Sequence, residues 1–269
     1  MSVTYPLGFR AGGIQAGLRT TPGLDLALIV NDGPADVVAG VFTTNRVCAA
    51  PVQWSRHATA DHKARAVIVN AAVANACTGI DGFADCDITF SRVDSDACMS
   101  TNDTVVAMAS GASGISLTGD ELTDALTELC AILARQLVAD AEGSHHDVKV
   151  TVTGAISTEA AAAVAREVTR SNLVKTAIAG NDPNWGRILA AIGCVPENVA
   201  PFDPDQVDVS INDIQICKAG GIGEDRNLVD MRPREVHIDI ELHAGDAEAA
   251  VWTNDLTHQY VEENSEYTS

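Results

Sequence analysis

The order of the hydrophobic patterns constrains the fold of this chain more than any other feature. Three short runs rich in β-branched residues come first, at 25–31, 37–44 and 65–71, and they indicate strands. Their nearly continuous apolar character favours strands that are covered on both faces. The main helical patterns follow them, without the strand–helix alternation of a Rossmann fold. We therefore expect an α+β fold of layered sheets and helices.

The middle of the chain alternates between helix and strand. An apolar stripe from Leu122 to Val138 predicts a long helix, and Thr118 and Glu121 have the spacing of a capping box at its start. A strand is expected over 147–155 and a helix over 157–171, with Ser157 as its N-cap.

Residues 171–193 predict two helices around a tight connection. Gly180 suits the C′ position after the first helix, and Asp182 suits the N-cap of the second, with Pro183 in its first position.

The last third returns to strands before it ends in a short helix. A hairpin is expected over 207–217. The strict alternation at 235–242 predicts a strand with one buried face, and 248–254 is expected to pair with it. A helix over 255–264 completes the pattern.

Composition narrows the class of protein. The 269 residues suffice for one large domain or two moderate ones, and the net charge of −20 argues against nucleic-acid partners and anionic membranes. No apolar run reaches the ~18 residues of a membrane span, and no secretory signal opens the chain. Seven cysteines without a CxxC pair fit reduced thiols. These features predict a cytoplasmic protein.

Several polar clusters raise the question of metal binding. Asp94, Asp96 and Asp103 either ligate a hard cation or form a hydrogen-bonded turn before a strand, and the lack of EF-hand spacing favours the turn. His145 and His146 are neighbours, so their side chains diverge and serve one metal poorly; we expect a solvated turn. The sequence predicts no metal site.

Other segments have weak signals for ligand binding. The glycine-rich stretches at 11–17 and 218–225 match neither GxGxxG nor the P-loop pattern, so flexible connections are favoured. Cys77 has no neighbouring histidine to activate it as a nucleophile.

Two segments have stronger signals for an amino-acid site. In "GNDPNWGR", a helix N-terminus with Lys175 and Arg187 nearby either holds a substrate carboxylate or is a structural cap whose arginine pairs with a surface acid. Glu142 lies at the end of the long helix, where the helix dipole disfavours a carboxylate. Its side chain either is solvated or binds a cationic amine.

Longer motifs together carry a resemblance to a known family. They are "GFRAGGIQAGLR", "AGVFTTNRVCAAPV", "NACTG", "DACMSTNDTV", "DAEG", "SNLVKTAIAGNDPNWGRILAAIG" and the ending "DLTHQYVEENSEYTS". Over nearly its whole length the chain resembles the ornithine acetyltransferase family, the bifunctional enzymes of arginine biosynthesis, also called glutamate N-acetyltransferases.

The resemblance implies a ping-pong acetyl transfer. Family members cut themselves at an internal Ala–Thr bond, and the freed threonine takes acetyl from N-acetylornithine and passes it to glutamate. A Thr–Gly pair stabilises the oxyanion. The resemblance implies no metal and no cofactor, although some members use acetyl-CoA as a substrate. It also implies assembly from two α and two β chains.

One departure from the family is large. "GFADC" runs almost directly into "TFSRVDSDACMSTND", with a seam near residues 85–89 where on the order of a hundred residues, comparable to a small domain, are absent. Residues 1–86 then resemble the start of the family's α chain, and 87–269 resemble most of its β chain. The absent central section carries the nucleophile and the oxyanion hole, and Thr59 in "HATAD" does not replace the nucleophile. No catalytic residue therefore carries over.

Three positions do match the family's substrate-binding residues: Glu142, Asn264 and Ser269. Two smaller departures are the residues before "ANA" in 70–79 and His146, where the family often has lysine. Three hypotheses follow: an acetyltransferase that keeps its activity, a catalytically inactive remnant with an incomplete core and poor folding, or a module that binds ornithine or glutamate.

Overall fold

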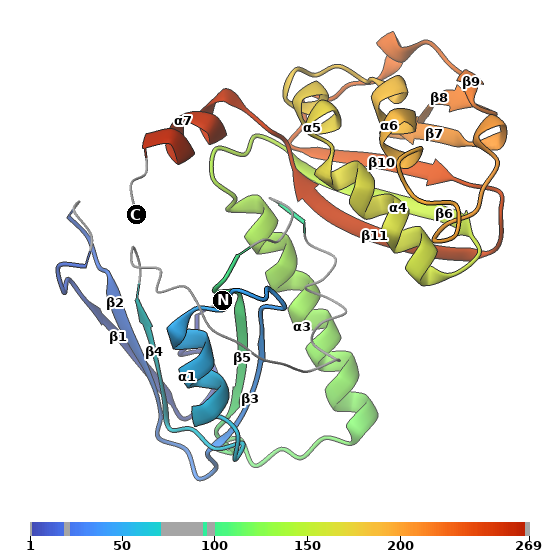
Figure 1. The fold of residues 1–269 in the computed structure, drawn as a ribbon. Coiled ribbons are helices and arrows are strands. Elements are labelled where there is room, and N and C mark those ends of the chain that lie inside the picture. The colour runs from blue at the N-terminus through green and yellow to red at the C-terminus, as the bar shows by residue number, and fades with distance from the viewer. Residues whose placement is uncertain (1, 19–21, 71–93, 96–99, 267–269) are drawn as a thin grey trace. The chain divides into compact units, whose positions relative to one another are not determined.

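The computed structural model describes residues 2–18, 22–70, 94–95 and 100–266 (Figure 1). The described residues fall into two compact units. The first unit contains those from 2–70 and 100–127, and the second contains 94–95 and 128–266. The sequence predicts a different division, into 1–86, which resembles the family's α chain, and 87–269, which resembles its β chain. That division stays a prediction. Each unit is described by itself.

The second unit is built on a six-stranded mixed sheet with strand order β11-β6-β10-β7-β8-β9. β10 is parallel to β6, and the other neighbours are antiparallel. The strands are β6 (Asp147–Ala155), β7 (Asp208–Ile211), β8 (Ile214–Lys218), β9 (Gly221–Ile222), β10 (Glu235–Glu241) and β11 (Ala247–Asn254). The hairpin predicted for 207–217 and the alternation predicted for 235–242 are confirmed.

Three helices pack on one face of this sheet: α4 (Thr158–Arg170), α5 (Asn172–Ala179) and α6 (Trp185–Ile192) (Figure 1). Every second residue of β6 points into the core below them, because side chains alternate along a strand. The largest fully buried side chains of this core are valines, leucine and isoleucines such as Ile188, Ile211 and Ile238. Two short 3₁₀ helices, Pro204–Gln206 and Arg226–Leu228, lie in the connections.

The pairing predicted between 248–254 and 235–242 is wrong. β11 pairs with β6, which lies between β11 and β10. The connection after β10 crosses the end of β6, where Leu242 N donates to Thr153 O and the amides of Ala244 and Gly245 donate to Gly154 O. These bonds carry the chain over β6, so neighbours in sequence are not neighbours in the sheet.

The helices of the second unit follow the sequence, but two predicted cap positions are shifted. Ser157 caps α4, as predicted, by accepting from Ala160 N at 3.1 Å. Two helices form in 171–193, but Gly180 is the C-cap itself, and Asn181 takes the left-handed conformation with φ 53°. Asn184, rather than Asp182, caps α6, because Asp182 N still bonds back to Ala177 O.

Two further helices complete the inventory, and the first of them has residues in both units. α3 runs over Gly119–Ala139, and its predicted capping box is confirmed: Thr118 N donates to Glu121 Oε2 at 2.8 Å, and Glu121 N donates to Thr118 Oγ1 at 3.3 Å. α7 spans His258–Glu266, later than the predicted start at 255. Among the described residues, no helix is both long and apolar enough to cross a bilayer.

The first unit contains two small antiparallel sheets and one helix. β1 (Phe9–Ile14), β2 (Leu26–Asn31) and β4 (Ala66–Asn70) form one sheet, and β3 (Val37–Phe42) pairs with β5 (Thr104–Ala109) in the other. Helix α1 (Ala50–Ala58) packs with Cys48, Ala49 and Val52 against Phe42. The strands at 25–31, 37–44 and 65–71 are confirmed, whereas α1 and β1 were not predicted from the sequence.

Two expectations for this unit are wrong. The strands are not covered on both faces, because large apolar side chains of β2 and β4 are exposed. The glycine-rich stretch at 11–17 is not simply a flexible connection, since Gly12 and Gly13 lie within β1 in register with Leu28 and Ala27. Backbone hydrogen bonds of the sheet fix these two glycines, which have no side chains to pack.

Candidate functional site

The structure brings together two of the three predicted substrate-binding residues. Glu142 lies in the turn after α3 and Asn264 lies on α7, and Asn264 Nδ2 donates to Glu142 Oε2 at 3.1 Å. The same amide donates to Tyr260 O at 2.9 Å. Both side chains are exposed to solvent. Ser269 lies outside the described residues, and the assignment of all three to substrate stays a prediction.

Thr257 fixes α7 against the turn that carries Glu142. Its hydroxyl donates to Gly143 O at 2.6 Å and accepts from Tyr260 N at 3.0 Å, so it caps α7 and joins the helix to the turn. Gly143 has φ 60°, and a side chain there would collide with the backbone of Tyr260. The close approach of the two segments therefore requires glycine at position 143.

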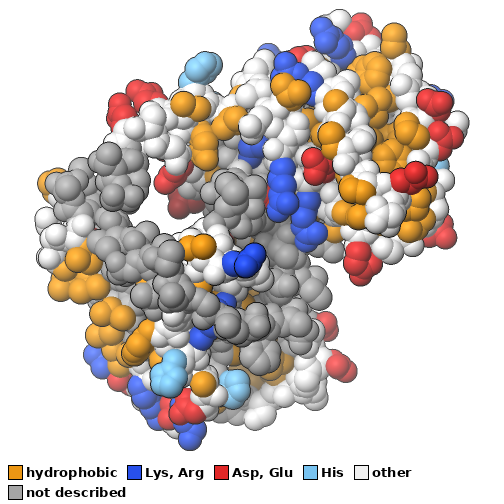
Figure 2. Space-filling view, in the orientation of Figure 1, with side chains coloured by type: hydrophobic (Ala, Val, Ile, Leu, Met, Phe, Trp, Pro, Cys, Tyr) orange, Lys and Arg blue, Asp and Glu red, His pale blue; other side chains and the backbone are white. Residues whose placement is uncertain are grey.

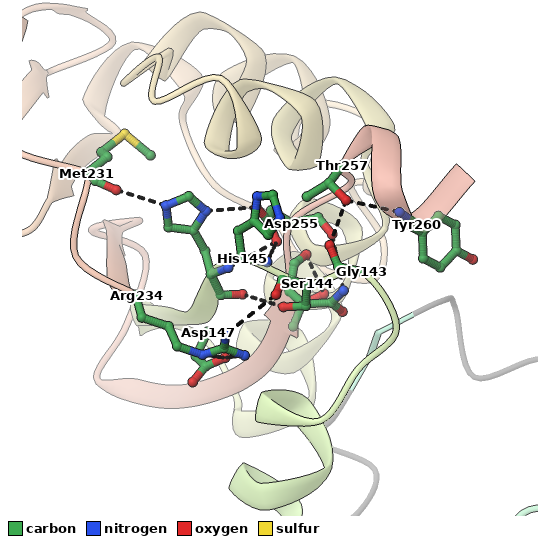
Figure 3. A network of polar contacts seen from close by, with 12 residues as sticks. Gly143, Ser144, His145, Asp147, Met231, Arg234, Asp255, Thr257 and Tyr260 are labelled. Atoms are coloured by element: carbon green, nitrogen blue, oxygen red, sulfur yellow. Dashed lines mark hydrogen bonds and ion pairs between the residues drawn. The ribbon is translucent and has the colours of Figure 1, made fainter. Parts of the chain in front are cut away.

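A buried histidine–aspartate pair lies behind this turn (Figure 3). Asp255 is fully buried; its Oδ1 accepts from the amides of His145 and His146 at 2.9 and 3.1 Å. Its Oδ2 lies 2.7 Å from His146 Nδ1, and His146 Nε2 lies 2.9 Å from Met231 O. Because a carbonyl only accepts, Nε2 carries a proton and donates to Met231 O. Both ring nitrogens and both carboxyl oxygens therefore have partners inside the fold.

This pair corrects the expectation of a solvated turn for His146. The His146 side chain is buried, whereas His145 is exposed. A buried charge is tolerated when it is paired and hydrogen-bonded, and every polar atom of the His146 ring has a partner. The pair thus anchors the turn to the end of β11 and, through Met231, to the loop before β10.

Arg234 completes the support of the turn. Its Nη2 donates to Ala139 O, the last residue of α3, at 2.6 Å, and its Nε donates to Asp147 Oδ1 at 3.0 Å. A cation at the C-terminal end of a helix is favourable, because the carbonyls there lack helical partners. Figure 3 shows Arg234 and Asp147 side by side below the histidine. The backbone around Glu142 is therefore held from both ends.

A pocket of about 580 Å³ opens beside α7, but on another face of the helix. Its lining residues include His145, Ala179 and Thr257, together with the α7 side chains His258, Gln259, Glu262, Glu263 and Glu266. Asn264 and Glu142 do not line it. The direct contact between the two predicted residues marks the candidate site, because an exposed acidic helix face is ordinarily solvated surface.

A second buried polar cluster lies under α5. Lys175 Nζ donates to Ser95 O at 2.6 Å and to Thr253 Oγ1 at 3.0 Å, and Thr253 Oγ1 donates to Asp94 O at 2.5 Å. Arg170 Nε donates to the buried Asp94 Oδ2 at 2.7 Å. This cluster ties residues 94–95 to α4 and to β11.

The segment "GNDPNWGR" was expected either to hold a substrate carboxylate or to be a structural helix cap, and these contacts distinguish the two. Lys175 is buried in the cluster, and Arg187 Nη1 donates to Leu173 O at 2.7 Å. The two cations are therefore used inside the fold, and the described structure supports a structural role for this segment. The surface acid expected as the partner of Arg187 is replaced by a backbone carbonyl.

The remaining sequence candidates have simple outcomes. No group of three or more His, Cys, Asp or Glu side chains within the described ranges has metal-binding geometry. Asp103 precedes β5 in the predicted turn, where Asn102 N donates to Ser100 Oγ at 3.0 Å. Thr59 follows α1, and its hydroxyl donates to Ser55 O at 2.8 Å. Cys77 and Asp96 lie outside the described residues.

Sequence reasoning missed Asp255, Thr257 and Arg234. Asp255 and His146 are 109 residues apart in the chain, so no local pattern connects them. Thr257 had a detectable signal, because a threonine directly before a helical segment is a common N-cap. The expected start at 255 hid it.

The fold and the paired residues define a mixed α+β protein with a polar site between a helix terminus and a C-terminal helix. Comparison with known proteins gives its family. The ArgJ family model matches residues 10–89 and 84–269, so the chain belongs to the ArgJ family. The two matches meet at 84–89, where the sequence analysis located a seam.

Relatives match over their whole length. The chain is 40% identical to the arginine biosynthesis bifunctional protein ArgJ of Bifidobacterium longum over 391 positions, covering 100% of both chains. It is 37% identical to that of Streptomyces coelicolor over 386 positions, again covering 100% of both. Because this chain has 269 residues, 122 of the 391 positions (391 less 269) face no residue of it.

A solved structure supports the fold. The crystal structure of the arginine biosynthesis bifunctional protein ArgJ from Bacillus halodurans is 35% identical, with a TM-score of 0.60, and the match covers 66% of this chain and 87% of that one. The mixed α+β class expected from the sequence is therefore confirmed, and the acyltransferase family of arginine biosynthesis is the right one.

Proposed function

We propose that this chain contributes the amino-acid-binding half of an ArgJ site, for N-acetylornithine, ornithine and glutamate, and lacks the nucleophile for acetyl transfer. In the reaction that the family implies, the amide bond of N-acetylornithine breaks, acetyl passes to a threonine hydroxyl, and ornithine leaves. The amine of glutamate then attacks the ester and takes the acetyl group.

The contact between Glu142 and Asn264 carries this proposal. Glu142 presents a solvent-exposed carboxylate, which suits the ammonium group of ornithine, and the Asn264 amide offers a donor and an acceptor beside it. The turn and α7 are both fixed by buried contacts of Asp255 and Thr257. A site held this way loses little freedom when a ligand binds.

The absence of the nucleophile is supported by the way the family matches. The two matched segments meet at 84–89, and 122 positions of the Bifidobacterium longum alignment have no residue here. Thr59 is a poor substitute, because its hydroxyl is bonded to the carbonyl of Ser55 after α1. Removing the nucleophile alone can cost about 10⁶ in rate in an enzyme that uses one.

Two further properties remain predictions from the resemblance: assembly with α and β chains, and use of acetyl-CoA as an alternative acetyl donor. A cytoplasmic location remains a prediction from the composition of the chain. A complete acetyltransferase is the competing function, and it requires another residue of this chain to act as the nucleophile.

Calorimetry tests the binding proposal. Ornithine, N-acetylornithine and glutamate are titrated to millimolar concentrations into the chain and into E142Q, N264A and E262Q. We expect heat for at least one ligand with the unchanged chain, weaker binding for E142Q and N264A, and no change for E262Q, which lies in the neighbouring pocket. Absence of heat with the folded, unchanged chain would contradict the proposal.

An activity assay tests the second half of the proposal. The chain is mixed with N-acetylornithine and glutamate, and the release of ornithine is followed. We expect no turnover. Turnover by the purified chain alone would show that a residue within it replaces the threonine.

A further inference from the structure

The sheet of β1, β2 and β4 has one face made mainly of apolar side chains and glycine, with the cation Arg10 opposite Val30 on the same face. In an antiparallel sheet, residues directly opposite each other point to the same side. Leu28 lies opposite both Gly12 of β1 and Ile68 of β4, and Ile14 lies opposite Leu26. These residues therefore form one continuous face, which we call the open face.

The open face is exposed and hollowed. Ile14, Leu28 and Ile68 are 59%, 46% and 63% exposed. A depression of about 490 Å³ lies over these strands, and a side chain at Gly12 would meet no atom within 4 Å. Figure 2 shows hydrophobic side chains at the surface over β1 and β2. An exposed apolar patch with a depression at a glycine is suited to accept a side chain of another protein.

The central strands of the second unit differ from this face, although apolar side chains of β3, β5 and β9 such as Val37, Val106 and Ile222 are also exposed. β6 alternates between buried and half-buried residues, and its neighbour β10 has Val236, Ile238 and Ile240 fully buried. Sheets with an apolar face are stable when a second layer covers that face. Within the first unit, no described helix or strand covers the open face.

The family match indicates what the covering layer is. β4 ends at Asn70, and the two family matches meet shortly after it, at 84–89. The relatives are matched in full, yet 122 alignment positions have no residue in this chain. A section of that size suffices for a small domain with its own apolar surface.

We propose that the open face is a docking surface for a polypeptide carrying the section that relatives have opposite these 122 positions. Three observations favour this occupant over a second copy of the chain: the apolar face lies on the strands that precede the break, the section is absent here, and the relatives contain it. The inference rests on the family assignment and not on the proposed ligand, and its test does not use acetyl transfer.

The test uses the full 269-residue chain and, as probe, the polypeptide of the Bifidobacterium longum relative that has no counterpart here. The two are co-expressed and purified, and the dissociation constant is measured. Ile68→Glu places a charge on the open face, and Val69→Glu, on the opposite face of the same strand and 50% exposed, is the matched control. We expect a 1:1 complex that Ile68→Glu weakens at least about tenfold, the value of one buried apolar side chain, and that Val69→Glu leaves unchanged.

A second experiment covers the case in which the probe polypeptide does not fold by itself. It uses a spliced protein, in which the probe section is part of the same chain. The same section is inserted into the chain within 84–89, and thermal unfolding is compared with and without Ile68→Glu. Docking predicts that Ile68→Glu lowers the midpoint of the spliced protein and not that of the 269-residue chain. Equal effects in both proteins, binding that ignores Ile68→Glu, or a dimer of the chain alone that Ile68→Glu dissolves would each overturn the proposal.

Discussion

The two units of this protein use the same residue types to different effect. In the second unit, the valines and isoleucines of β6 and β10 lie beneath α4, α5 and α6 and are almost fully buried. In the first unit, β1 contains no fully buried residue, and the core around α1 consists of Cys48, Ala49 and Val52 with Phe42. Strand-forming residues alone do not make a core; a second layer must cover them.

The comparison refines the expectation of poor folding. A missing section was expected to leave an incomplete core in the whole chain. The second unit has a continuous core, so we expect the weakness to lie in the first unit, where exposed apolar side chains gain little on folding. Net stabilities of domains are only about 5–15 kcal/mol, so a unit without a covered sheet is easily unfolded.

The largest expected effect comes from breaking the buried His146–Asp255 pair of the second unit. Asp255→Ala removes the partner of the His146 ring and the acceptor of two amides. Each buried polar group left without its hydrogen-bond partner costs about 1–3 kcal/mol, and the variant leaves three such groups. The loss in free energy of unfolding is measured by urea unfolding, with the hydrogen exchange of β6 and β11 as the local readout.

Asp246→Ala is the matched control, because Asp246 is an exposed acid of the same unit. It should change the free energy of unfolding by less than about 0.5 kcal/mol. If Asp255→Ala were equally mild, the pair would not be a structural element of the second unit.

A smaller effect tests the difference in packing directly. Ile238→Ala empties a fully buried position in β10 and should cost about 2–5 kcal/mol. Ile68→Ala makes the same chemical change on the open face and should cost less than about 0.5 kcal/mol. Equal costs in urea unfolding would mean that the face of β1, β2 and β4 is covered in solution.

Helix caps give the next test. Ser157→Ala removes the acceptor for Ala160 N at the start of α4, which packs on the sheet, and should lower the stability of the second unit by about 1 kcal/mol. Thr118→Ala makes a similar change at the exposed start of α3. We expect it to fray the first turn of α3, seen by hydrogen exchange, without moving the unfolding midpoint of β6 and β10.

The elements that could be predicted from the sequence have local causes. The alternation of β10, the stripe of α3 and the caps at Ser157 and Thr118 are set by residues a few positions apart. The place of β6 between β10 and β11 is not, because it depends on hydrogen bonds of the connecting loop to Thr153 and Gly154. β1 was missed because its glycines lack the side chains that mark strands.

The candidate site divides in the same way. Glu142 and Asn264 were found through the family motifs, and their contact could not be derived, because they are 122 residues apart in the chain. The prediction for His146 was wrong because its neighbours are polar, and its burial depends on Asp255 and Met231 from distant strands and loops. Only the folded structure makes such partners visible.

The smallest expected effect concerns acid sensitivity. Burial alone would raise the pKa of Asp208, but hydrogen bonds from Ala219 N and the His243 ring, together with the charges of His243 and Lys218, hold this pKa below its usual value. Glu241 lies on the other side of His243, with Oε1 3.9 Å from Nδ1. A carboxyl with a lowered pKa binds its proton at a lower pH in the folded state than in the unfolded state.

The stabilisation from Asp208 is therefore present above pH 3.8, the ordinary pKa of the group, and is lost as the pH falls through the lower folded value. Asp208→Asn should remove this part of the acid sensitivity, within the range of about 0.2–1 kcal/mol of partly exposed pairs. In the first unit, Arg10 lowers the pKa of Asp32 in the same direction through a side-chain hydrogen bond, but both groups are exposed. The difference in free energy of unfolding between pH 3 and pH 6 should thus change with Asp208→Asn and not with Asp32→Asn. A change with Asp32→Asn alone would mean that the first unit, and not the second, contributes the acid sensitivity.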